Sequence, residues 1–136
     1  MSFEVCVLAS GSSGNSTYVS SGRTRVLVDC GLVARELVKR LGELDVDPRT
    51  LDAIFITHAH QDHYRSAGTI QAKYGVPVFT EHLTLATIRS AGDPGSFGRV
   101  KDCRPVPDRI GDLMVDTFPV PHGTPASSGL PVGYVF

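Results

Sequence analysis

The chain contains the heptapeptide Thr57-His58-Ala59-His60-Gln61-Asp62-His63 at the end of a short apolar run, residues 51–57. Four of its side chains can bind a metal ion, and three of the five histidines of the chain lie in it. The apolar run is typical of a strand covered on both faces. Because residues two apart at a strand end project the same way, His58 and His60 can bind one ion. Asp62 and His63 can turn toward a second ion as the chain leaves the strand. The alternative interpretation is a solvated polar loop.

These residue types do not by themselves select the metal, because imidazole and carboxylate groups suit Zn²⁺, Mn²⁺ and iron. The sequence lacks the His-Glu-x-x-His motif of helical zinc proteases and the Gly-x-Ser-x-Gly motif of serine hydrolases. The Ser/Gly-rich stretch 10–15 lacks the Gly-Lys-Ser/Thr of a P-loop and precedes an expected strand. A nucleotide-binding loop is therefore not supported.

The hydrophobic pattern on either side of the heptapeptide predicts a mixed α/β layer structure, one sheet with helices packed on it. Strands 3–9, 17–20 and 25–29 are expected to form an antiparallel start. The remaining expected strands are 51–57, 76–80, 113–120 and 131–136, and the expected helices are 33–44, 65–74 and 83–91. Residues 92–108 are predicted to be loop and residues 109–112 a turn.

The composition is that of a globular domain and excludes several other classes. In 136 residues, 13 Lys and Arg stand against 14 Asp and Glu, a net charge of −1, and 41% of residues are hydrophobic. An intrinsically disordered chain and a strongly basic nucleic-acid-binding protein are therefore excluded. The sequence shows neither a long apolar run nor a signal peptide, so we expect a cytoplasmic protein without a membrane partner. The three separated cysteines predict buried, reduced thiols rather than disulfides or a thiolate zinc site.

The pattern His58-x-His60-x-Asp62-His63 resembles the signature of the metallo-β-lactamase fold, a group of hydrolases built as two face-packed sheets with helices outside. Residues 8–16 (Leu-Ala-Ser-Gly-Ser-Ser-Gly-Asn-Ser) and 28–31 (Val-Asp-Cys-Gly) resemble the opening motifs of its YycJ/WalJ-like branch, whose members are described as DNA exonucleases. The resemblance implies an αββα sandwich, of which this chain supplies the N-terminal sheet-plus-helices half.

The resemblance also implies a centre of two divalent metal ions, Zn or Mn. His58, His60 and His122 would hold the first ion and leave a position for water, as in catalytic sites. A lone histidine such as His122 would more often be a surface or core residue, but the flanking sequence favours a ligand. Asp62 and His63 would hold the second ion, and Asp62 would act as the catalytic residue that orients the attacking hydroxide.

Two further roles follow from the resemblance. Asp29 would be a buried residue behind the ligands that orients the histidine loop. The loop 10–15 would lie near the metals, where Ser12 or Ser13 and the backbone amides would contact a substrate phosphate. The alternative interpretation is that this loop is simply a turn.

In the family, a bridging aspartate and a final histidine come after the region matched here. We therefore expect residues 1–136 to be the N-terminal portion of a single metallo-β-lactamase-like domain, a fragment of a longer protein. Asp62 and His63 would then bind the second ion more weakly than the three histidines bind the first ion. The alternative is a complete, shortened protein that forms a homodimer.

For the whole protein we expect a metal-dependent hydrolase, a phosphodiesterase or exonuclease that acts on DNA through a metal-activated hydroxide. The net charge of −1 gives this substrate no independent support, so it rests on the branch resemblance. The alternatives are a metallo-hydrolase of small esters, thioesters or lactams, and a non-catalytic truncated metal-binding fragment.

Overall fold

The main element of the fold is a six-stranded sheet with the strand order β1-β2-β3-β4-β5-β6. The computed structural model describes residues 3–90, 103–119 and 132–136. The strands are β1 (Glu4–Ala9), β2 (Ser16–Ser20), β3 (Arg25–Val28), β4 (Ala53–Ile56), β5 (Val78–Thr80) and β6 (Cys103–Arg104). The first three are antiparallel neighbours, and β3 to β6 run parallel. The predicted antiparallel start is thus confirmed, and the later strands continue the sheet in parallel.

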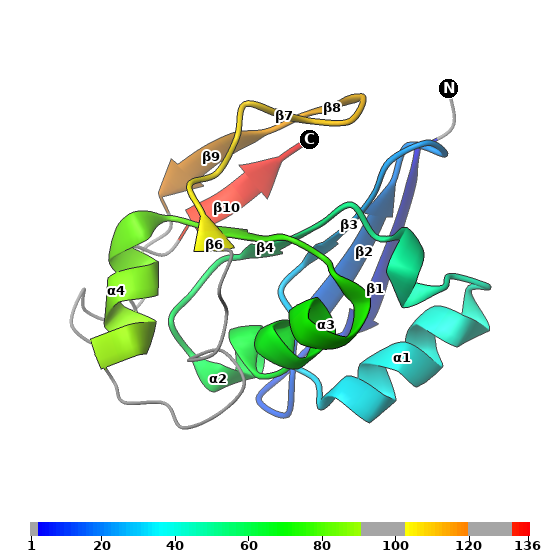
Figure 1. Cartoon of the computed structure of the whole chain (residues 1–136), viewed down its shortest axis with the longest axis horizontal. Coiled ribbons are helices and arrows are strands. Elements are labelled where there is room, and N and C mark those ends of the chain that lie inside the picture. The colour runs from blue at the N-terminus through cyan, green and yellow to red at the C-terminus, as the bar shows by residue number, and fades with distance from the viewer. Residues whose placement is uncertain (1–2, 91–102, 120–131) are drawn as a thin grey trace.

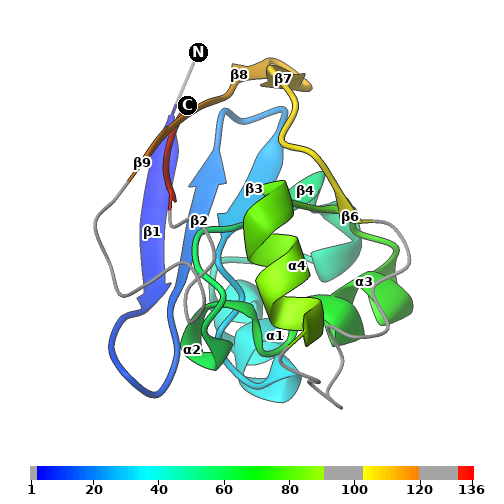
Figure 2. The same cartoon turned by 90° about the vertical axis from the view of Figure 1, so that its left-hand side faces the viewer.

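Helices cover one face of this sheet (Figures 1 and 2). They are α1 (Ala34–Glu43), α2 (Gln61–Tyr64), α3 (Ala67–Tyr74) and α4 (His82–Ser90), with a short 3₁₀ helix at Pro48–Thr50. In α1, Leu37 and Leu41 are one turn apart and fully buried against the sheet. Helix α3 ends at Gly75, whose left-handed φ of 73° suits a residue without a Cβ. The three helices predicted from the sequence are therefore present with small shifts in their ends.

Strands of a second layer lie on the opposite face of the sheet (Figure 1). They form two antiparallel pairs, β7 (Arg109–Ile110) with β8 (Leu113–Met114) and β9 (Asp116–Pro119) with β10 (Val132–Val135). Phe55 of β4 packs there against Phe79, Tyr134 and Phe136, with ring centroids 5.2–5.5 Å apart. Both faces of β4 are covered, and all four of its residues are buried, which explains its continuous apolar sequence.

Some boundaries predicted from the sequence are wrong. Arg109–Ile110 is a strand rather than part of a turn, and the turn itself lies at Gly111, whose φ is 56°. The expected strand 113–120 is divided into β8 and β9. Strand β6 lies in the predicted loop and is stabilised by pairing with β5, a long-range contact that two residues cannot signal by periodicity. Residues 91–102, 120 and 131 of the predicted elements lie outside the described residues.

Two cysteines can be compared with the expectation of buried thiols. Cys30 is buried and Cys6 is partly buried, and both are free. Burial raises the pKa of the Cys30 thiol to about 12. Among the helices of the described ranges, none is both long and apolar enough to cross a lipid bilayer.

Candidate metal centre

The heptapeptide lies at the carboxyl ends of the parallel strands β3 and β4. Strand β4 ends at Ile56, and the histidines follow at once. Val28, the last residue of β3, pairs with Phe55, so that Asp29 leaves the sheet beside Thr57. The edge at which parallel strands end is the usual place for a ligand site in sheets of this kind.

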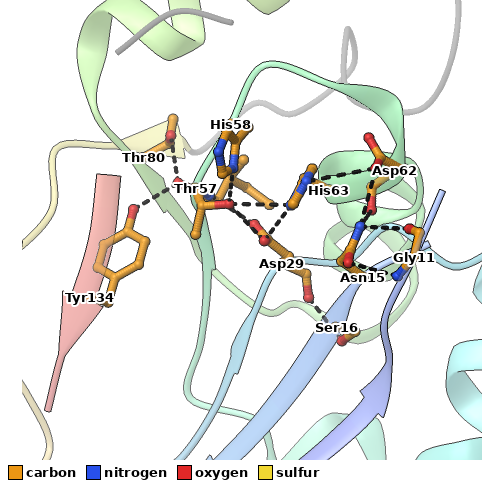
Figure 3. A network of polar contacts seen from close by, with 11 residues as sticks. Gly11, Asn15, Ser16, Asp29, Thr57, His58, Asp62, His63, Thr80 and Tyr134 are labelled. Carbon is orange, nitrogen blue, oxygen red and sulfur yellow. Dashed lines mark hydrogen bonds and ion pairs between the residues drawn. The ribbon is translucent and has the colours of Figure 1, made fainter. Parts of the chain in front are cut away.

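Asp29 is the buried centre of the polar network in Figure 3. Its Oδ1 accepts a hydrogen bond from the backbone N–H of Thr57 at 2.8 Å, and its Oδ2 accepts one from the Thr57 hydroxyl at 2.7 Å. His63 Nδ1 lies 2.6 Å from the same Oδ2. The Asp29 backbone has a φ of 66°, a left-handed conformation that Asp tolerates better than most residues. Asp29 therefore joins the end of β3 to both ends of the heptapeptide.

These bonds fix the protons of two histidine rings. A carboxylate cannot donate, so His63 Nδ1 must carry the proton that it shares with Asp29. The single hydroxyl proton of Thr57 goes to Asp29, and His58 Nδ1, 2.6 Å from that hydroxyl oxygen, is then the donor to it. In their neutral forms both rings keep the lone pair on Nε2, the atom available to bind a metal ion.

The pKa of His63 results from opposing effects. Burial lowers the pKa, but the hydrogen bond from His63 to Asp29, the charge of Asp29 and the charge of Asp62 outweigh burial. The pKa therefore lies above its ordinary value of 6.5. The two carboxylates favour a positive charge at His63. Either a second proton on the ring or a bound metal ion would provide this charge.

Asp62 and His63 are spaced to bind one ion. His63 Nε2 lies 3.7 Å from Asp62 Oδ2. Two ligand atoms that each bind Zn²⁺ at about 2.1 Å with a tetrahedral angle are about 3.4 Å apart. A shift of a few tenths of an ångström would let both atoms reach the same ion, so these residues fit a divalent metal ion.

His58 and His60 lie beside this pair. Their rings are nearly parallel, with centroids 6.1 Å apart, and the His58 ring lies 4.4 Å from that of His63. Asp29, His58 and His63 form a group whose potential ligand atoms all lie within 4.8 Å of one another. Because both oxygens of Asp29 already accept hydrogen bonds from Thr57, its contacts are those of an orienting residue rather than a ligand.

Not every residue in the expected ligand set can be placed. His58, Asp62, His63 and Asp29 lie together around one edge of the sheet, and His60 immediately precedes α2. His122 lies outside the described residues, and its proposed role as a ligand stays a prediction.

Two loops hold α2 in place, and the sequence analysis missed this function. Helix α2 has only four residues, so its carbonyl groups need partners from elsewhere. The backbone N–H of Asn15 donates to Asp62 O at 2.7 Å, and that of Cys30 donates to His63 O at 2.7 Å. A Cβ on Gly31 would lie 1.7 Å from Asp62 O, so only glycine fits there. The contact between Asn15 and Asp62 joins residues 47 apart in sequence, which no local pattern shows.

The loop 10–15 contacts the heptapeptide through Asn15, and several of its backbone amides already have hydrogen-bond partners. The N–H of Gly11 donates to Asn15 Oδ1, and that of Gly14 to Gly11 O. These amides hold the loop together and are not directed toward a phosphate. Ser12 and Ser13 are exposed at the tip of the loop, and no hydrogen bond joins their side chains to the described part of the chain.

The class of protein follows from a match over most of the chain. Residues 9–135 match the family model described as Metallo-beta-lactamase superfamily. The chain belongs to this superfamily, and membership implies divalent metal ions. The fold agrees, because the solved Rm3 metallo-beta-lactamase is similar with a TM-score of 0.75 and 19% identity over 96% of this chain and 52% of that one.

Among individual proteins, the chain is similar to two that are named exodeoxyribonucleases. It is 32% identical over 130 residues to exodeoxyribonuclease WalJ of Streptococcus pneumoniae, covering 88% of this chain and 46% of WalJ. It is 31% identical to exodeoxyribonuclease YycJ of Bacillus anthracis, covering 90% and 47%. A ribonuclease Z of Mycobacterium is 33% identical over 100 residues, which cover 68% of this chain and 33% of the relative. The chain spans about half the length of the WalJ and YycJ relatives.

Proposed function

We propose that the protein is a metal-dependent phosphodiesterase that degrades DNA as an exonuclease. The observation that carries the proposal is the pair Asp62 and His63, with Nε2 and Oδ2 3.7 Å apart and the other ring nitrogen of His63 bonded to Asp29. The similarity to WalJ and YycJ supports DNA as the substrate.

The ligand assignment is part of the proposal. His58 and His60, with His122, hold the first ion, and Asp62 and His63 hold the second. When bound, divalent ions supply Lewis acidity, which lowers the pKa of a water molecule and polarises a phosphoryl oxygen. The ligand types do not by themselves choose between Zn²⁺ and Mn²⁺, so both are tested.

The chain's own residues then orient the reaction. Asp62 offers carboxylate oxygens that accept a hydrogen bond from the attacking water and direct it at the phosphorus atom. Asp29 and Thr57 keep the rings of His63 and His58 in the tautomers that expose Nε2. Ser12 and Ser13 are exposed in the neighbouring loop and would donate hydrogen bonds to a phosphate of the DNA strand.

The proposal extends to the protein as a whole. Residues 1–136 would be the N-terminal portion of one metallo-β-lactamase-like domain, in line with the 46–47% of WalJ and YycJ that they cover. The protein would act on DNA in the cytoplasm. Sequencing the coding region beyond the codon for Phe136 tests the first statement.

The decisive assay uses the full-length protein with Mn²⁺ or Zn²⁺ and a panel of substrates. The panel contains single- and double-stranded DNA, RNA, a bis-aryl phosphodiester and a thioester. Release of mononucleotides from DNA ends is expected, together with slower hydrolysis of the bis-aryl phosphodiester. Turnover of RNA or of the thioester without DNA would overturn the choice of substrate. No turnover and no bound metal would favour a non-catalytic protein.

Matched histidine variants test the site itself. His58→Ala combined with His60→Ala is expected to abolish activity and to remove the first ion. His82→Ala is the control, because the His82 side chain is 91% exposed and pairs only with Glu81 among the contacts described. Equal activity in the two variants would contradict the assignment of the site.

A further inference from the structure

We propose that Asn15 is a positioning residue that fixes the carboxylate of Asp62 for the second metal ion. This inference rests on the proposed function, because it gives Asp62 its role as a ligand. It concerns a residue of the Ser/Gly-rich loop, 47 positions away from the residue that it would orient.

The orientation of the Asn15 amide is set by the loop. Its Oδ1 accepts a hydrogen bond from the backbone N–H of Gly11 at 3.1 Å. A carbonyl oxygen must face that N–H, so the amide cannot be turned over. The Nδ2 group is therefore directed at Gly11 O at 2.9 Å and at Asp62 (Figure 3).

The Nδ2 group reaches two oxygens of Asp62. It lies 3.0 Å from the backbone O and 3.2 Å from the carboxylate Oδ2. An amide has two protons, so one serves Gly11 and the other is shared between the two oxygens of Asp62. The backbone N–H of Asn15 adds a third bond to Asp62, which reaches the backbone O at 2.7 Å. Main chain and side chain of Asp62 are thus held by one residue.

The oxygen that Asn15 contacts is the one that matters for the ion. Oδ2 of Asp62 is also the atom 3.7 Å from His63 Nε2. A carboxylate oxygen has two lone pairs, so Oδ2 can accept from Asn15 and still bind a metal ion. The contact selects the rotamer in which Oδ2 and Nε2 face each other before any ion arrives. Asn15 thereby lowers the reorganisation needed to bind the second ion.

Two variants of the full-length protein separate this role from a purely structural one. Asn15→Asp keeps the size of the side chain and an acceptor for Gly11 N–H, but it directs a carboxylate oxygen instead of a donor at Asp62. Asn15→Ser keeps a polar group that is too short to reach Oδ2. Ser10→Ala is the matched control in the same loop, because the Ser10 side chain is exposed and makes no hydrogen bond to described residues.

The main readout is the binding of Co²⁺. It is measured by isothermal titration calorimetry and by the visible absorption band that appears with the second equivalent of Co²⁺. We expect the dissociation constant of the second ion to rise about 10- to 100-fold in Asn15→Asp, with the first ion nearly unchanged, as for other residues behind metal ligands. The absorption band of the second equivalent should change shape as well. Asn15→Ser should weaken the binding of the second ion less, and Ser10→Ala should not change the binding of either ion.

Three outcomes would overturn the inference in distinguishable ways. Unchanged affinity and an unchanged second band in both variants would show that Asn15 does not position Asp62. If both ions bound more weakly to the same degree and the melting temperature fell, Asn15 would serve only to stabilise the loop. Binding of fewer than two ions by the unmodified protein would remove the second site itself, a failure of the proposed function that is visible before any variant is made.

Discussion

His63 Nδ1 lies 2.6 Å from Asp29 Oδ2. This contact joins the end of β3 to the last residue of the heptapeptide that follows β4. The contact gives the histidine both its tautomer and its orientation. It also places a buried negative charge directly behind a residue that we assign as a metal ligand. The tautomer and the orientation of His63 therefore depend on Asp29.

Asp29→Asn tests this dependence. Asn tolerates the left-handed backbone of position 29, so the change affects charge and hydrogen bonding rather than backbone strain. An Asn amide directed at His63 Nδ1 would move the ring proton to Nε2, the atom needed for the ion. We expect about 10- to 100-fold weaker binding of the second ion. The free energy of unfolding should fall by about 1.5–3 kcal/mol, as for other bonds to charged groups.

Asp112→Asn is the matched control for this change. Asp112 accepts hydrogen bonds from Ser21 and Thr24, and these bonds lower its pKa, but it lies away from the heptapeptide. Titration with Co²⁺ and urea unfolding measure both variants. Equal loss of metal binding in the two variants would show that the charge of Asp29 has no special role.

The raised pKa of His63 predicts opposite pH dependences for stability and for metal binding. Because its pKa is higher in the folded state than the ordinary 6.5, protonated His63 stabilises the metal-free protein at low pH. This stabilisation is fully present below the unfolded pKa and is lost as the pH rises through the folded pKa. A metal ion must displace the same proton, so the apparent affinity falls as the pH drops below the folded pKa.

Urea unfolding of the metal-free protein between about pH 5 and about pH 9 checks the sign for stability. His63→Gln is the reference, because glutamine does not titrate in this range. The difference between the two midpoints should shrink as the pH rises. A difference that is constant with pH, or that grows, would show that folding does not raise the pKa of His63.

The parts of this site that could be predicted are those with a local signal. The buried strand β4 and the heptapeptide after it are continuous in sequence, and α1 shows its apolar spacing directly. The resemblance to a known family added Asp29, whose partners Thr57 and His63 are 28 and 34 residues away. These elements are confirmed as structure, whereas their roles as ligands stay predictions.

The parts that could not be predicted depend on contacts between distant segments. Helix α2 is four residues long and depends on backbone donors from Asn15 and Cys30. A loop rich in Ser and Gly predicts a turn, but nothing in its composition shows that its last residue will contact Asp62. The pairing of β5 with the two residues of β6 is missed for the same reason.

Gly31→Ala tests the close approach of the two loops to α2. The added Cβ would lie 1.7 Å from Asp62 O and 2.8 Å from Asn15 N, both backbone atoms, so the main chain must move. We expect a loss of about 1–3 kcal/mol in the free energy of unfolding, as for other overpacked positions. Metal binding should weaken as well, because Asp62 is displaced.

Gly42→Ala is the control for this substitution. Nothing lies within 4 Å of a Cβ at Gly42, which lies in α1. Its stability should be unchanged or should rise by up to about 1 kcal/mol, since alanine favours helix. Urea unfolding compares the two variants, and equal midpoints would contradict the steric argument for Gly31.

Tyr134→Phe tests whether the second layer of strands supports the metal centre. The Tyr134 hydroxyl of β10 donates to Ile56 O at 2.7 Å, and Thr80 donates to the same carbonyl at 3.1 Å. Ile56 directly precedes the heptapeptide, while the Tyr134 ring packs on Phe55 with centroids 5.2 Å apart. The substitution keeps the ring and removes the hydroxyl. We expect a loss of about 0.5–1.5 kcal/mol in the free energy of unfolding.

The effect of Tyr134→Phe on metal binding should be smaller than that of Asp29→Asn. Tyr134 contacts the main chain at Ile56, which precedes the ligands, whereas Asp29 contacts the ring of His63 itself. Thr80→Val is the matched control, since it removes the other donor to the Ile56 carbonyl and keeps a branched side chain. Comparable losses of stability in the two variants are expected from urea unfolding. If Tyr134→Phe left both the unfolding midpoint and the Co²⁺ affinity unchanged, strand β10 would contribute packing alone. The heptapeptide would then depend only on the six-stranded sheet for its position.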